Sequence, residues 1–167
     1  MERKTHKMKM LAVVLVIVGL ASNSSATAQM GERLLYKGAT NRLCTLPLEP
    51  YLKEHNLRLY EVAPPKKFIM STGCWRGYIG TWQIKDGFLW LVSVENLDQT
   101  QVPLSKVFTN QVPPIKATWY SGTLHVTQGK MLRYVHAEFE STFERDLYIE
   151  IVDGKVINER AQENKAD

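Results

Sequence analysis

Three titratable residues alternate near the end of the chain: His136, Glu138 and Glu140. On a β-strand, residues two apart project from the same face, so one imidazole and two carboxylates would lie side by side. Such a set suits a divalent metal or general acid–base catalysis, with His125 as a further member. The same alternation is typical of the solvated side of a sheet. A small metal-dependent or acid–base hydrolase is therefore one alternative, and no catalytic residue is assigned.

No catalytic or cofactor motif accompanies these residues. The sequence lacks a G-x-S-x-G elbow, a phosphate-binding G-x-x-x-x-G-K-[ST] loop, an H-E-x-x-H pair and a dinucleotide fingerprint. We therefore expect no cofactor, and the sequence favours a binding protein over an enzyme.

The densest group of aromatic residues lies between positions 71 and 91. Trp75, Arg76, Tyr78 and Trp82 fall within eight positions, among several glycines. Aromatic rings and arginine supply the energetic centres of many interfaces, so these four are the candidate binding residues, for an unknown protein or small ligand. The alternative is that the rings fill the core, Trp82 and Trp90 above all. Glycine inside a strand indicates a bulge or the close approach of another group.

From Trp75 to Leu91 the sequence follows the pattern W-R-G-Y-x-G-x-W-x-I-x-D-G-x-L-x-L. This pattern resembles that of small uncharacterised bacterial exported proteins. The resemblance implies a β-family and brings no settled activity.

The chain has two cysteines, Cys44 and Cys74. Thiols of exported proteins often pair, and a bridge closing a loop of about 30 residues would stabilise the fold by roughly 3 to 4 kcal/mol on the chain-entropy model. The alternative is two separate buried thiols. No second Cys or His lies at the close spacing of a zinc site.

The N-terminus has the three parts of a secretory signal. Four basic residues within positions 1–9 precede an uncharged apolar run at 11–21, and the segment ends in Ala26-Thr27-Ala28. The run is about half the length of a membrane span. We therefore predict a signal peptide over 1–28 with cleavage after Ala28, and a periplasmic or extracellular location with no membrane span afterwards.

Export changes the interpretation of the charge. The chain has 21 basic and 17 acidic residues. Without the four basic residues and the one acidic residue of positions 1–28, 17 and 16 remain, a net charge of +1. Nucleic-acid binding, which requires a basic patch or stripe, is not expected.

Short runs of β-branched and aromatic residues, separated by x-Gly pairs, make up the remaining sequence. The clearest unit is a run at 78–85, Asp86-Gly87, and a second run at 88–94, which predicts a type I′ hairpin. Similar units are predicted at 115–127 and 147–158, with a further strand over 131–139 after a turn at Gln128-Gly129. Earlier strands are predicted at 34–37 and 57–62.

These elements predict a mostly β fold, in one domain over 29–158 with a polar C-terminal tail over 159–167. We expect an antiparallel meander closing into a barrel-like or strongly curled sheet, with a sandwich as the alternative and one short helical segment near 49–56. The proline-containing segment 98–114 is expected to be a long connection.

The sequence favours an exported, non-enzymatic binding module, with the 75–82 region and the 98–114 connection as its contact surface. The alternatives are the hydrolase described above and a barrel that binds a small apolar ligand in its interior.

Overall fold

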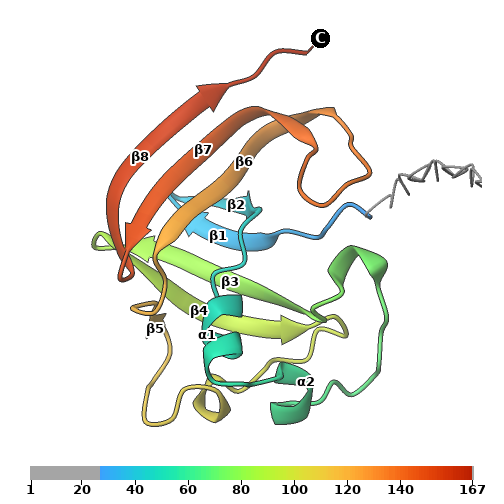
Figure 1. Cartoon of the computed structure of the whole chain (residues 1–167), viewed down its shortest axis with the longest axis vertical. Helices are drawn as coiled ribbons and strands as arrows, with labels where there is room; N and C mark the ends of the chain where they lie inside the picture. Colours follow the sequence, from blue (N-terminus) through green and yellow to red (C-terminus); the bar gives the residue numbers. More distant parts are fainter. Residues whose placement is uncertain (1–26, 167) are drawn as a thin grey trace, which may run out of the picture.

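In a computed structural model, which describes residues 27–166, eight β-strands form one sheet with several short helices at its end (Figure 1). The strands are β1 (Glu32–Tyr36), β2 (Ala39–Leu43), β3 (Tyr78–Lys85), β4 (Phe88–Asn96), β5 (Ile115–Lys116), β6 (Gly122–Arg133), β7 (Thr142–Val152) and β8 (Lys155–Glu163). The helices are α1 (Glu49–Glu54), α2 (Leu59–Val62) and the 3₁₀ turns η1 (Thr72–Cys74) and η2 (Leu104–Lys106). The mostly β fold and the short helix near 49–56 are confirmed. The signal-peptide prediction falls almost entirely on residues outside those described.

Seven of the strands form a hydrogen-bonded ring. Their order is β3-β1-β2-β6-β7-β8-β4, and a β3–β4 pairing closes it, while β5 adds to β4. All pairs are antiparallel except β1–β3. That pair is parallel because the chain from β2 to β3 crosses the end of the ring through α1 and α2. The barrel-like closure is confirmed, and the sheet is mixed where a purely antiparallel one was predicted.

The hairpin at Asp86-Gly87 forms as predicted. Both residues have positive φ, 53° and 74°, as a type I′ turn requires. Asp153 and Gly154 make a second such turn between β7 and β8. The two turns meet at the closure of the ring, where Leu89 N–H donates to Gly154 O over 2.8 Å.

Several predicted elements are wrong in their extent. The run at 57–62 contains α2, because Leu59, Val62 and Ala63 have helical spacing and Leu59 is buried. The predicted hairpin at 115–127 does not form, since β5 pairs with β4 and β6 pairs with β7. Gln128-Gly129 is a bulge within β6. The last strand continues to Glu163, five residues beyond its predicted end.

Side chains fill the inside of the ring. Leu34, Trp82, Leu91, Leu124 and Ile149 are fully buried in one cluster. At one end, aromatic rings of α1 and of residues 97–121 pack together and close the core. Phe108 lies 4.5 Å from Tyr51 and 5.1 Å from Trp119 between ring centroids. An apolar ligand inside the ring would have to displace this packing.

Candidate functional site

A hollow in the described surface lies outside the ring, under the loop that joins α2 to β3. This loop, residues 63–77, is the green segment beside α2 in Figure 1. It encloses a pocket of about 640 Å³ together with α2 and the turn after β4. The volume falls in the range of small-molecule sites.

Large apolar side chains stand exposed around this pocket. Phe68 is 78% exposed, Met70 84% and Trp75 70%, and Tyr60 and Ile69 are also exposed. All five line the pocket. A contiguous apolar patch of this kind is uncommon on a folded domain and marks a binding site more often than scattered single residues do. We call these five residues the Trp75 surface.

Asp98 holds the loop in place from the turn after β4. One of its carboxylate oxygens accepts the backbone N–H of Lys67 at 2.8 Å. The other accepts the N–H and the hydroxyl of Thr100 at 3.1 and 2.6 Å. These hydrogen bonds lower the pKa of Asp98 to about 2, so the carboxylate stays charged in all but strong acid.

Arg76, predicted to be a contact residue, points inward. Its side chain is only 1% exposed, and its Nη2 donates to Met30 O at 2.9 Å. Its Nε lies 3.6 Å from Glu32 Oε1, and the Glu32 side chain is completely buried. The Arg76 side chain is therefore buried beneath the pocket surface, while the neighbouring Trp75 is exposed.

Tyr78 and Trp82, two of the candidate binding residues, are buried in the core, in agreement with the alternative that these rings fill it. Trp82 is 0% exposed and its indole N–H donates to Glu32. Tyr78 is 2% exposed, and its hydroxyl donates to Glu49 Oε1 at 2.7 Å. Burial and the neighbouring carboxylates raise the pKa of Tyr78 well above its usual value. Both residues lie in β3 and belong to the core cluster. Trp90 is half-buried on the outer side of β4, with its N–H donating to Lys85 O.

Gly80 makes the Glu32–Trp82 contact possible. A Cβ at this position would lie 2.7 Å from Glu32 Oε2 and 2.8 Å from Trp82 Nε1. The expectation that glycine in this strand marks a close approach is confirmed here. Burial raises the pKa of Glu32 to about 7, against the opposing effect of the Arg76 charge and the hydrogen bonds from Trp82 and Gly80.

His136, Glu138 and Glu140 do not form a common face. The predicted strand over 131–139 ends at Arg133, and the three residues lie in the loop between β6 and β7. This loop is extended toward the N-terminal segment, where Gln29 N–H donates to Glu138 O at 2.7 Å. Within residues 27–166, no group of three or more His, Cys, Asp or Glu residues is placed to hold a metal ion.

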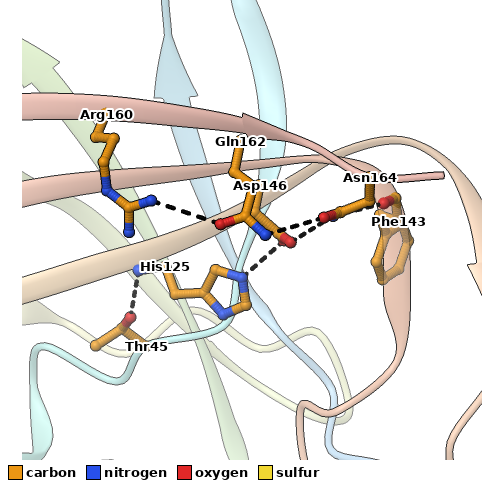
Figure 2. A network of polar contacts seen from close by, with 7 residues as sticks. All are labelled: Thr45, His125, Phe143, Asp146, Arg160, Gln162 and Asn164. Carbon is orange, nitrogen blue, oxygen red and sulfur yellow. Dashed lines mark hydrogen bonds and ion pairs between the residues drawn. The ribbon is translucent and has the colours of Figure 1, made fainter.

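His125 belongs to a polar network on the outer side of β6, β7 and β8 (Figure 2). Its Nε2 lies 2.8 Å from Asp146 Oδ1, and Asn164 donates to the other oxygen of Asp146 at 2.6 Å. The imidazole stacks on Tyr148, with Arg160 on that ring. These three side chains come from β6, β7 and β8, so their contacts join three strands.

The predicted disulfide does not form, because Cys44 and Cys74 are free buried thiols. Cys44 follows β2 and Cys74 precedes β3, with the chain at Met30 between them. β1 lies between β2 and β3, so the two cysteines are next to strands that are not neighbours, whereas a bridge requires Cα atoms within about 7 Å. The thiol of Cys74 donates instead to Tyr78 O at 3.3 Å, and burial raises the pKa of both thiols.

No family model matches the chain, and comparisons with curated proteins and with solved structures give no significant match. The assignment of a site therefore depends on the geometry alone. Sequence analysis identified Trp75 but missed Phe68 and Met70. The available signal was the apolar run Phe68-Ile-Met70 after Pro64-Pro65, which has neither helical nor strand periodicity with its neighbours.

Proposed function

We propose that the protein is an exported, non-enzymatic binding module that takes an apolar group into the pocket beneath loop 63–77. The observation that carries this proposal is the Trp75 surface: five large apolar side chains exposed around one hollow of about 640 Å³. Covering these side chains on binding would bring a favourable free energy of about 25 cal/mol for each Å² of apolar surface removed from water.

The reactive groups around the pocket already have structural roles. Both oxygens of Asp98 accept hydrogen bonds from the loop and the turn. The Cys74 thiol donates to a backbone carbonyl, and burial keeps it protonated at neutral pH. Arg76 is turned toward Glu32. Because these groups are engaged in structural contacts, the pocket is better suited to binding than to catalysis.

A titration with an uncharged apolar fluorophore, N-phenyl-1-naphthylamine, tests the proposal. We expect saturable binding that weakens about tenfold in Trp75→Ala and again in Phe68→Ser, because each change removes a large contact worth more than 1 kcal/mol. These side chains are exposed, so both variants should unfold at the temperature of the wild type.

Val112→Ser and Ile157→Ser are the matched controls, since both residues are exposed apolar positions outside the pocket. They should bind the fluorophore as the wild type does. Equal affinity of Trp75→Ala, Phe68→Ser and the controls would show that the ligand binds elsewhere.

A further inference from the structure

Loop 63–77 carries four of the five residues of the Trp75 surface, and it lies within a segment whose charged side chains are all basic. Residues 62–85 contain four basic residues and no acidic residue. Two of the basic residues, Lys66 and Lys67, are exposed and immediately precede Phe68. Cationic and apolar side chains are therefore presented together by one short segment.

Further basic groups border the same surface. A second depression, of about 420 Å³, shares Tyr60 and Trp75 with the pocket and is lined also by Lys53 and Arg58. The acidic groups nearby are engaged: Glu49 accepts from Tyr78, Asp98 accepts from the loop, and Glu61 lies 3.8 Å from Arg58. The exposed charge on the loop itself is positive, because Lys66 and Lys67 are exposed and residues 62–85 contain no acidic residue.

From this arrangement, and on the basis of the proposed function, we propose that the partner of the Trp75 surface is an anionic phospholipid bilayer. Phe68, Met70 and Trp75 enter the boundary between headgroups and acyl chains, while Lys66 and Lys67 contact the lipid phosphates. Tryptophan prefers this boundary, and basic residues near it are attracted to anionic lipids.

The adjacent lysines distinguish a bilayer from a protein partner. Lysine is depleted in protein–protein interfaces, because a strongly hydrated ammonium is costly to bury. At a membrane surface the lysine stem lies along apolar groups while the ammonium stays among headgroups. An apolar side chain directly after two lysines fits the second environment.

The test is quenching of tryptophan fluorescence by vesicles of phosphatidylglycerol with brominated acyl chains. The full chain is used, because quenching reports the position of Trp75 locally, whatever the N-terminal run does. Subtracting the signal of a Trp75→Phe variant isolates the emission of Trp75. We expect quenching with phosphatidylglycerol vesicles that decreases with added salt, and little quenching with brominated phosphatidylcholine.

Lys66→Glu/Lys67→Glu should raise the lipid concentration for half-maximal quenching more than twentyfold, since each lysine near an anionic surface accounts for about a fivefold change in affinity. Lys130→Glu/Lys155→Glu, which makes the same charge change at exposed sites away from the loop, should quench like the wild type. Phe68→Ser/Met70→Ser should lose the quenching.

Unchanged Trp75 emission with phosphatidylglycerol, or equal loss in the two lysine variants, would overturn bilayer docking. If the apolar fluorophore still binds under those conditions, the pocket binds apolar groups and a protein or free ligand is its partner. If the fluorophore also fails to bind, the proposed function itself is wrong.

Discussion

Glu32 is an ionisable residue whose protonation is strongly altered by burial in the fold. Its carboxyl is fully buried between the Trp82 indole and the Arg76 guanidinium, and Oε1 and Arg76 Nε have no hydrogen-bond partner among the described residues. A buried charge with incomplete hydrogen bonding is costly, so the protonated carboxyl gains population in the folded state. The group thus links the pocket wall at Arg76 to the core at Trp82.

This burial predicts a pH-dependent stability. The folded pKa of Glu32 is about 7, above its ordinary value of 4.5, so the folded state binds more protons between these values. The free energy of unfolding should therefore fall as the pH rises from 4.5 to 7, by up to about 3 kcal/mol from this group.

Urea unfolding at pH 4 to 8 measures the effect, with Glu32→Gln as the reference. Gln retains an acceptor for the Trp82 N–H and does not titrate, so the wild type should lose stability relative to this variant as the pH rises. A difference between the two proteins that stays constant over this range would show that Glu32 has an ordinary pKa when folded.

Loop 63–77 depends on one side chain from another element. The Asp98 carboxylate joins Lys67 N to Thr100, and so sets the position of the Trp75 surface relative to the turn after β4. A loop already fixed in its binding conformation does not lose further entropy when the ligand binds.

Asp98→Ala should therefore weaken binding of N-phenyl-1-naphthylamine about tenfold, although Asp98 lies at the edge of the apolar patch. Asp98→Asn, which retains an acceptor oxygen, should bind with intermediate affinity. Thermal unfolding should change little, because Asp98, Lys67 and Thr100 are outside the core cluster. Wild-type affinity in Asp98→Ala would mean that the loop does not need this anchor.

Elements governed by local residues were predicted well. Asp86-Gly87 and Asp153-Gly154 both form type I′ turns, because positive φ is a property of the two turn residues themselves. Elements that depend on distant partners were not. Residues 134–140 have a strand-like pattern, yet they follow the end of β6 and contact the segment at Gln29, more than a hundred residues earlier in the chain.

The candidate site shows the same division between features set by local residues and features that depend on distant partners. Aromatic and arginine content led to Trp75 but also to Tyr78, Trp82 and Arg76. Composition does not reveal whether a side chain points to the surface or into the core. The partner of Trp82 and Arg76 is Glu32, over forty positions away, and a single carboxylate in β1 carries no local sign of burial. Exposure separates Trp75 from the other three.

At the scale of the whole molecule, side chains fill the interior of the ring, and the pocket under loop 63–77 lies on its outer side. Closure between β4 and β8 depends on the two meeting turns, where a Cβ on Gly154 would lie 2.7 Å from Ala117 O. The interior holds the Trp82 cluster, and α1 with the 97–121 connection packs rings against its end. No helix within residues 27–166 is long and apolar enough to cross a membrane.

The central claim is that an apolar ligand binds under loop 63–77 and not inside the ring. Hydrogen–deuterium exchange of the full chain, with and without saturating N-phenyl-1-naphthylamine, tests it most directly. We predict slower exchange of backbone amides in residues 59–78 and 96–98, with unchanged exchange in β6 and β7. Protection confined to β6 and β7, with loop 63–77 unaffected, would place the ligand within the ring and contradict the claim.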